Sequence, residues 1–479
     1  MKQVISMMLN TVAFSPTCLM HNAYLRCPEP MLLARPETAM ATQLVRRDAL
    51  KLATAAISLV PSASVLAADV TTTKPTQLLR ASWTATDGFS DASFIQFDEG
   101  AYAAMRDDEK RTPLFERAIQ QRLAAAPPNT LTVLDLGTGP FALLALVAAR
   151  AGAKKVYTIE ANKEAANRAR EALEKAKVTN VEVIEGFSTA ISLPEKVDLL
   201  VAEIAGSIAS EEGAYATICD AQARFLKRPN DSASYIPTRI ETLAAPCSYA
   251  IHYALGPPAF DWTKLKEPVR LNCRDESMQL LASPQLLESI AFADPQLPSA
   301  GLLPVQPPLT WTVDGERVAS NARVFYEELK REGVTGAEAI ALSDGVSRSF
   351  SGLAMWARLR IDLGMNAVDC PLMARDCLPH QVLSPLMSSE CHLISSLIRW
   401  PRLILDPEGT IVVESRGPKG EHSKSHWQTV LPLVAARPAT VMPSQRISAS
   451  FQVDLRDGKP STPLKYSLAA EVLAEETVA

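Results

Sequence analysis

The chain has 479 residues, of which 47% are hydrophobic, and this is enough material for two or three domains with their own cores. Its formal net charge is -5, from 48 basic and 53 acidic residues that are closely interleaved. This balance excludes the basic field with which proteins hold nucleic acid by its phosphates, and a basic partner suits the chain better. The eight cysteines include no Cys-X-X-Cys pair and the chain has six histidines, so neither a metal site nor a disulfide framework is predicted.

The first 68 residues are predicted to be a targeting or unstructured segment that precedes the fold. Arg46 and Arg47 precede an apolar run of about eleven residues that ends near Val60, and small residues around Ala67 are typical of a cleavage site. The run is too short for a membrane span, which needs roughly 20 apolar residues. The pattern indicates a twin-arginine export signal or the second half of a plastid presequence, and an amphipathic helix with a chance arginine pair is the alternative. A plastid location is therefore expected, with the cytosol as the alternative.

From residue 91 to residue 204, helices are predicted to alternate with strands, a pattern typical of a doubly wound parallel sheet. Helical turns are expected within 91–128, where apolar residues recur at helical spacing until Pro127 and Pro128 stop them. The predicted elements that follow are a strand at 131–137, a helix at 140–153, a strand at 155–161, a helix at 162–177, and strands at 181–186 and 196–204. Together they predict a Rossmann-like α/β domain over residues 69–240.

The sequence beyond residue 240 predicts a second domain, over residues 241–479, that is mostly β. Prolines cluster between Pro257 and Pro308, and several later runs alternate polar and apolar residues as strands do. The expected strands lie at 309–315, 353–363, 410–416, 428–434 and 447–455. The stretch from Trp262 to Leu287 has helical character. It predicts a helical insertion near residues 258–300 that could pack on another subunit, which leaves a homodimer open.

The stretch "LDLGTGPFALLAL", residues 134–146, joins the first predicted strand to a helix through a glycine turn. Gly137 and Gly139 let the backbone turn sharply and approach a ligand, and the start of the helix favours negative groups. Glu160 ends the next strand about 20 residues on, where such folds bind the two ribose hydroxyls of an adenosine cofactor. Pro140 is compatible with a first helical turn, since its missing N–H has no partner there. An ordinary strand-to-helix turn beside an exposed glutamate is the alternative.

Four separated motifs resemble the protein arginine methyltransferase family, and the similarity runs in order from about Phe94 to Val434. They are "GAYAAMRDDEKRT", the pair "VLDLGTG" and "YTIEA", the hairpin "AEIAGSIASEEGAY", and the loop "KSHWQTVLPL". Members of this family are class I methyltransferases in which a Rossmann-like domain is followed by a β-barrel. The resemblance therefore implies S-adenosyl-L-methionine as cofactor, an arginine-containing protein as substrate, and methylation of a guanidinium nitrogen.

The resemblance also implies roles for residues of the first and last motifs. Met105 matches the family's substrate-side methionine, and Arg111 matches the arginine that meets the cofactor's carboxylate. Asp108 matches the acid of the N-terminal lid that pairs with the loop histidine, here His426, and Trp427 follows in a substrate-binding position. The pair of Asp108 and His426 would orient the lid or relay a proton.

The other matches form a cofactor set and a pair of acids. Besides Arg111, the residues implied to bind the cofactor are Asp135, Gly137, Gly139, Glu160, Ser188 and Thr189. Glu203 and Glu212, nine residues apart, match the family's two hairpin acids, and two carboxylates can hold the planar, permanently charged fork of a guanidinium. Their charge would polarise the nitrogen that attacks the methyl group in line. Glu211 lies one residue off this spacing and is expected to be dispensable.

Several departures from the family's pattern bear on these expectations. The hairpin stretch "IAGSIAS" is small and plain where the family is bulkier and more aromatic, which predicts a wider arginine pocket. Pro140 and Phe141 stand in place of the usual Thr-Gly, and Ser425 replaces the threonine before His426. Thr189 stands where many members have an acid. Its Ser-Thr pair resembles the monomethylating, tandem-domain branch, although one catalytic unit is present here.

Two other classes of function stay open from the sequence alone. One is an interaction protein that keeps the fold without cofactor binding, and the other is a methyltransferase that acts on a small molecule. The retained acids Glu160, Glu203 and Glu212 argue against the first class. The retained His426-Trp427 loop and the predicted β domain argue against the second.

Overall fold

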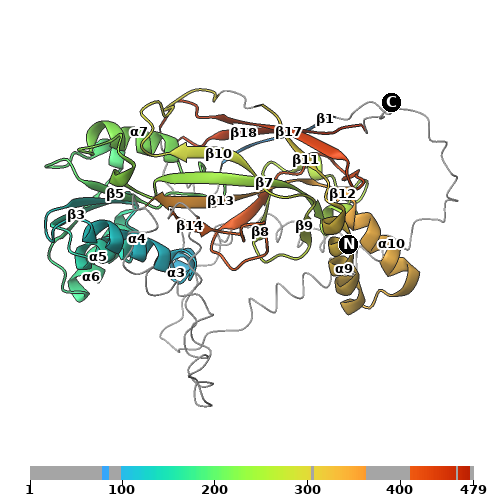
Figure 1. Cartoon of the computed structure of the whole chain (residues 1–479), viewed down its shortest axis with the longest axis horizontal. Coiled ribbons are helices and arrows are strands. Elements are labelled where there is room, and N and C mark those ends of the chain that lie inside the picture. Colours follow the sequence, from blue (N-terminus) through green and yellow to red (C-terminus); the bar gives the residue numbers. More distant parts are fainter. Residues whose placement is uncertain (1–77, 86–98, 304–306, 363–409, 460–461, 475–479) are drawn as a thin grey trace, which may run out of the picture.

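The computed structural model describes residues 78–85, 99–303, 307–362, 410–459 and 462–474. The predicted targeting segment, and with it the evidence for a plastid location, lies outside the described residues. Within those ranges, no helix combines the length and the apolar character that a membrane span requires. Figure 1 shows an α/β region at one end of the long axis and a region of extended strands beside it.

A parallel five-stranded sheet forms the α/β region, with the strand order β4-β3-β2-β5-β6. Its strands are β2 (Thr132–Leu136), β3 (Lys155–Glu160), β4 (Val181–Glu185), β5 (Leu199–Ala202) and β6 (Tyr235–Ile236). Every residue of β2 and β5 is buried, as expected for parallel strands that are covered on both faces. Figure 1 shows α5 (Leu143–Arg150) and α6 (Lys163–Lys175) on one side of these strands and α7 (Ala214–Arg224) on the other. The predicted doubly wound arrangement is confirmed.

Local chemistry explains where the helices of this region begin. Within the predicted helical stretch, the described helices are α3 (Glu99–Arg106) and α4 (Thr112–Ala124). The Asn162 side chain caps α6, because it accepts hydrogen bonds from the backbone N–H groups of Glu164 (2.9 Å) and Ala165 (3.1 Å). Helix α5 begins three residues later than predicted, since Ala142 has a left-handed φ of 46°. Pro140 therefore lies in the turn before α5 and not in its first turn.

Antiparallel strands form the second region. The larger sheet has seven strands in the order β10-β7-β13-β15-β8, with β14 paired to β13 and β9 paired to β7. A four-stranded sheet has the order β1-β18-β17-β11, and β12 pairs with β16. The bounds are β1 (Leu78–Thr84), β7 (Arg239–Tyr249), β8 (Val269–Asn272), β9 (Met278–Leu280), β10 (Gln285–Ala291), β11 (Leu309–Thr312), β12 (Ser349–Phe350), β13 (Gly352–Asp362), β14 (Thr410–Glu414), β15 (Gln428–Leu431), β16 (Ala439–Thr440), β17 (Arg446–Asp454) and β18 (Lys465–Val472). The five strands predicted here correspond to β11, β13, β14, β15 and β17, and they are confirmed.

Strand β1 comes early in the chain but belongs to the C-terminal sheet. It pairs with β18 along its whole length, from Leu78 opposite Glu471 to Thr84 opposite Lys465. Trp83 stacks on Tyr466, with ring centroids 5.4 Å apart. The second region thus contains a strand that precedes the α/β region in the sequence as well as the strands that follow it. The predicted division at residue 240 stays a prediction.

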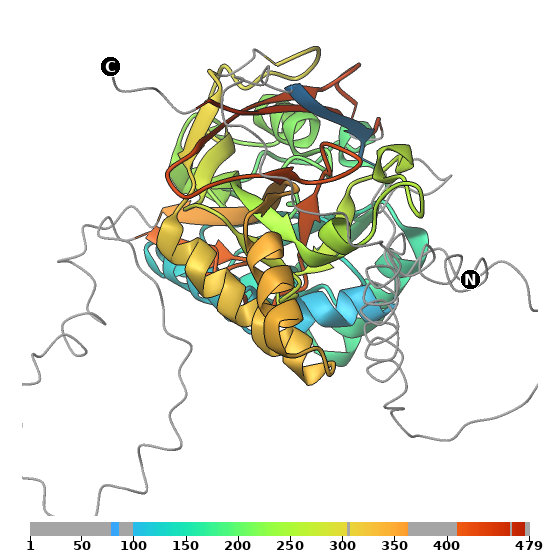
Figure 2. The ribbon, with the colours of Figure 1, turned by 90° about the vertical axis from the view of Figure 1, so that its right-hand side faces the viewer.

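The predicted helical insertion near residues 258–300 is wrong in its position. That stretch contains strands β8, β9 and β10. They are too short or too irregular to show the alternation of polar and apolar residues that indicates a strand. The insertion is instead formed by α9 (Gly315–Arg331) and α10 (Gly336–Ser347), an arm of two helices. The arm lies away from the α/β region in Figure 1 and faces the viewer in Figure 2 (yellow to orange). Short helices complete the described elements, namely η2 (Ser188–Ala190), η3 (Ser232–Ser234), α8 (Ala250–Ala254) and η4 (Trp262–Lys264).

Candidate active site

The glycine turn and the acid at the end of β3 are in direct contact. Gly137 and Gly139 have φ values of 82° and 61°, in the left-handed region that favours glycine. The backbone N–H of Gly139 donates to Glu160 Oε2 at 2.8 Å, and the N–H of Asn162 donates to Glu160 Oε1 at 2.8 Å. Burial raises the pKa of Glu160, although these backbone bonds oppose the shift. The structure therefore brings together the three residues predicted to hold an adenosine cofactor.

Asp135 lies inside the sheet beneath this turn. Its Oδ2 accepts a hydrogen bond from Thr158 Oγ1 at 2.8 Å, and Thr158 also bonds to Thr138 in the glycine turn. Burial raises the pKa of Asp135 to about 7, and the neighbouring Glu160 adds to the shift. Asp135 is thus placed to support the turn from below through Thr158.

Ser188 and Thr189 lie in the short helix η2, which follows β4 directly. Glu185, the last residue of β4, is opposite Glu160 in the parallel register, and the N–H of Gly186 donates to the Glu160 carbonyl at 2.9 Å. Arg224 of α7 holds the Ser188 carbonyl through a 2.5 Å bond from Nη2. Ser188 and Thr189, which were predicted to bind the cofactor, therefore lie at the same end of the sheet as Glu160.

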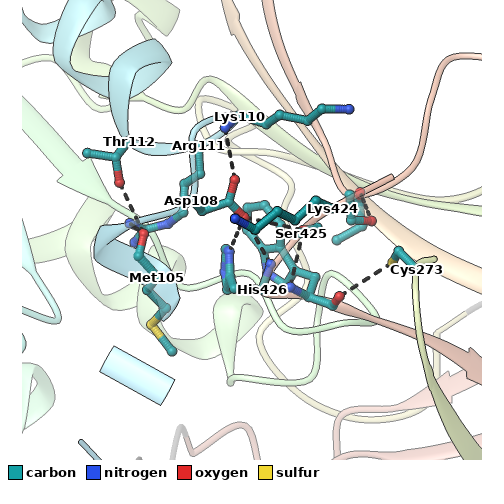
Figure 3. A network of polar contacts seen from close by, with 12 residues as sticks. Met105, Asp108, Lys110, Arg111, Thr112, Cys273, Lys424, Ser425 and His426 are labelled. Carbon is teal, nitrogen blue, oxygen red and sulfur yellow. Dashed lines mark hydrogen bonds and ion pairs between the residues drawn. The ribbon is translucent and has the colours of Figure 1, made fainter. Parts of the chain in front are cut away.

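Asp108 and His426 meet although 318 positions separate them in the sequence. Asp108 Oδ2 lies 2.8 Å from His426 Nδ1 and accepts a 2.9 Å bond from the backbone N–H of His426 (Figure 3). Its Oδ1 accepts from the N–H of Lys110 at 2.9 Å. Burial alone would raise the pKa of Asp108, but the bonds from His426 outweigh it and lower that pKa to about 2. The predicted pairing of these two residues is found in the structure, and the carboxylate in it is ionised at neutral pH.

Arg111 contacts an acid that the sequence assigned to the substrate. Its Nε donates to Glu203 Oε2 at 2.7 Å, and its Nη2 donates to the same oxygen. Its Nη1 donates to the Met105 carbonyl at 3.3 Å, so the guanidinium also closes the end of α3 (Figure 3). The two side chains are only 8% and 7% exposed. Arg111 therefore links the predicted cofactor side to the predicted arginine pocket, a contact that the sequence did not predict.

The loop that carries His426 and Trp427 packs against the acidic hairpin, residues 203–213. Trp427 donates from its indole Nε1 to the Ala205 carbonyl at 2.8 Å, and its ring lies 3.9 Å from that of His426 between centroids. The backbone N–H of Gln428 donates to Ser207 Oγ at 3.1 Å. Trp427 is 5% exposed. It stands behind the hairpin and supports it, so a direct contact with a substrate stays a prediction.

The three glutamates of the hairpin differ in their surroundings. The side chain of Glu203 is 7% exposed beside Arg111, and Glu212 is half-buried just before α7. Glu211 is 2% exposed and its Oε1 accepts a 2.8 Å bond from Arg270 Nη2 of β8. The expectation that Glu211 is dispensable rested on spacing alone, and its buried ion pair argues against it. The sequence alone did not indicate this pair, because Arg270 of β8 lies 59 residues after Glu211.

Among the described residues, no cluster of three or more histidine, cysteine, aspartate or glutamate side chains is arranged to hold a metal ion. The polar groups at the site are instead carboxylates, arginines and backbone amides. Such groups can bind a ribose, an amino acid carboxylate and a guanidinium.

A family described as "Methyltransferase domain" matches residues 133–232. Curated relatives include protein arginine N-methyltransferase PRMT10 of Arabidopsis thaliana, 48% identical over 98 residues, and PRMT10 of Oryza sativa subsp. japonica, 42% identical over 99 residues. Each alignment covers 20% of this chain and 25% of the relative, so the match spans a quarter of the relatives' own length.

A solved structure extends the comparison to most of the chain. It is the Trypanosoma brucei PRMT1 enzyme-prozyme heterotetrameric complex with AdoHcy, which is 15% identical, has a TM-score of 0.50, and is covered over 95% of its chain by 80% of this one. At this identity the likeness shows the fold. The fold and the matched segment define a methyltransferase-domain protein with a barrel-like β region. Within the matched segment the chain is similar to protein arginine N-methyltransferases, and the resemblance predicted from its motifs is confirmed.

Proposed function

We propose that this chain transfers a methyl group from S-adenosyl-L-methionine to a guanidinium nitrogen of arginine in proteins. The observation that carries the proposal is the meeting of three segments that are far apart in the sequence. The lid contributes Asp108 and Arg111, the hairpin contributes Glu203, and the loop contributes His426, and hydrogen bonds join all three segments. The names of the curated relatives support the same activity.

The residues present fit the cofactor. Glu160 presents a carboxylate at the end of β3, where it accepts a hydrogen bond from the N–H of Gly139, whose φ of 61° favours glycine. That arrangement suits a ribose diol next to an open backbone turn. Arg111 can hold a carboxylate while it keeps its bond to Glu203, because a guanidinium has five donors. When bound, S-adenosyl-L-methionine supplies an electrophilic methyl group.

The hairpin acids can hold and activate a guanidinium. Both bonds from Arg111 end on Glu203 Oε2, and Oε1 accepts only a long 3.4 Å bond from the Ala205 N–H among the bonds described. An oxygen with a second lone pair can accept a donor from a substrate guanidinium. Glu212 would bind the other side of the same group and fix the nitrogen that attacks in line. The Asp108–His426 pair holds the lid against the loop and can take part in moving the released proton.

The direct test is methyl transfer from labelled cofactor by the purified chain. An arginine-rich peptide should become labelled, while the same peptide with lysine at every arginine position should not. Free arginine is included because the hairpin stretch Ile204–Ser207 is small. Labelling of free arginine alone would contradict a protein substrate, and labelling of none of the three would contradict the proposed activity.

Cofactor binding is expected to depend on Glu160. Changing Glu160→Ala removes the acceptor for ribose hydroxyls, so the Kd of the cofactor product should rise at least tenfold, which is about 1.4 kcal/mol. Calorimetry measures this change. Glu182→Ala is the matched control, since Glu182 lies near the start of β4, opposite Tyr157, and its side chain is 51% exposed. Equal affinities of the Glu160→Ala variant and the unchanged chain would refute the ribose role.

We also propose that two copies of the chain pair in solution. The support is the two-helix arm α9–α10, which lies away from the α/β region (Figure 1), and a solved neighbour that is a heterotetrameric complex by its title. Sedimentation should give twice the chain mass of 51.8 kDa. A mass of one chain at micromolar concentration would contradict pairing.

A further inference from the structure

We infer that Arg270 is a positioning residue for the two substrate acids, and that it acts through Glu211. This inference rests on the function proposed above. Arg270 lies on β8 in the β region, whereas Glu211 lies in the acidic hairpin of the α/β region, directly before Glu212. The ion pair therefore joins the hairpin to the strand that faces it.

The ion pair between Arg270 and Glu211 has two hydrogen bonds and is largely buried. Arg270 Nη2 donates to Glu211 Oε1 at 2.8 Å and Nη1 approaches Oε2 at 3.4 Å, in the two-pronged arrangement that fixes direction as well as distance. The side chains are 12% and 2% exposed. A carboxylate this deeply buried is tolerated because the guanidinium and a backbone donor satisfy it.

Glu211 in turn fixes the hairpin backbone. Its Oε2 accepts a 3.0 Å bond from the N–H of Ile208, and its own N–H donates to the Ile208 carbonyl at 2.9 Å. Gly206 leaves room for this fold of the chain, because a Cβ atom there would lie 2.7 Å from Glu211 Cβ. Because the hairpin residues are small, the buried side chain of Glu211 has room to pack against them.

Arg270 is also connected to the loop on the other side of the site. Strand β8 pairs with β15, and Arg270 is opposite Val430, three residues after Trp427. Trp427 contacts the hairpin at the Ala205 carbonyl. One strand of the β region therefore supports the hairpin through an ion pair and the His426-Trp427 loop through the sheet, and both supports end next to Glu212 and Glu203.

The charge of Arg270 has a second consequence for the site. Glu211 and Glu212 are adjacent, so the hairpin carries two negative charges in succession. Arg270 neutralises Glu211, and Arg111 contacts Glu203 at the other end of the hairpin. A substrate guanidinium therefore enters a site in which Arg270 is already paired with Glu211 and Arg111 with Glu203.

The test compares turnover with cofactor affinity in the full chain. Arg270→Met should lower kcat on an arginine-rich peptide at least 30-fold, while the Kd of the cofactor product stays within twofold. Arg270→Lys keeps the charge and should stay within fivefold of the unchanged chain. The control is Arg274→Met, an exposed arginine in the turn after β8, which should leave both quantities unchanged.

The outcomes separate this inference from the proposed function. A peptide kcat within threefold of normal for Arg270→Met overturns the positioning role while the proposed function stands. An unchanged chain that transfers no methyl group to arginine overturns both. Should Arg270→Met fail to bind the cofactor product, Glu211→Gln replaces it as the test. A loss of kcat of at least tenfold supports the inference, and a kcat within threefold of normal overturns it.

Discussion

Changing Glu203→Gln or Glu212→Gln is expected to lower the rate of methyl transfer to an arginine peptide by about 1000-fold. Each change removes one charge-assisted bond to the guanidinium and part of the field that activates its nitrogen. Single-turnover kinetics with labelled cofactor measure the loss. Glu212→Gln should leave cofactor affinity unchanged. Glu203→Gln should weaken it slightly, because Glu203 also holds Arg111 by two hydrogen bonds.

The control for this prediction has to be an acid outside the hairpin. Glu211 does not serve, since it is buried and paired with Arg270. Glu171 of α6 is exposed and distant from the hairpin in sequence, and Glu171→Gln should keep the full rate. If both hairpin variants methylate the arginine peptide as fast as this control, the assignment of an arginine pocket is wrong.

Most of the α/β region could be predicted because its signals are local. Strand β5 is a continuous apolar run, β2 has three apolar residues around Asp135, and α6 starts at an asparagine that caps it. The start of α5 was not predicted correctly because Ala142 adopts a left-handed conformation, which alanine does not favour. Only the surrounding turn enforces such a conformation, and that turn depends on tertiary packing.

The helical arm was missed although its sequence carries a recognisable start. The Asp314 side chain accepts bonds from the N–H groups of Glu316 (2.9 Å) and Arg317 (3.2 Å), and Val318 and Phe325 are buried seven residues apart on α9. Those signals were available in "VDGERVASNARVFYEELKREG". The apparent helical pattern of residues 262–287 belongs instead to short strands such as β9, whose three residues pair with β7.

The site itself could be predicted as a set of residues but not as a set of contacts. The family resemblance implied that Glu203 and Glu212 are the two hairpin acids, and the spacing between the glycine turn and the end of the next strand indicated Glu160. The bonds from Arg111 to Glu203 and from Arg270 to Glu211 join elements 92 and 59 positions apart. Which acid each arginine takes depends on how the two regions pack.

Changing Asp108→Asn is expected to lower methyl transfer by about 100-fold and to destabilise the contact between lid and loop by about 2 kcal/mol. Asp108 holds His426 by both its ring and its backbone N–H, and an amide cannot replace the charged acceptor. Its pKa of about 2 lies below the ordinary value of 3.8, so the stabilisation is present at neutral pH and is lost progressively as the pH falls from about 3.8 to about 2. The activity of the unchanged chain should therefore not fall between pH 6 and about pH 5 through titration of Asp108.

The neighbouring Asp107 provides the matched control for this change. Asp107 is 63% exposed and pairs with Arg106 on the outer side of the lid, so Asp107→Asn should keep both the rate and the melting temperature. The double change of Asp108→Asn with His426→Asn should be no worse than either single change, because the two side chains act as one unit. If the effects of the two single changes instead multiply in the double variant, Asp108 and His426 act independently, and the hydrogen bond between them is not what holds the lid against the loop.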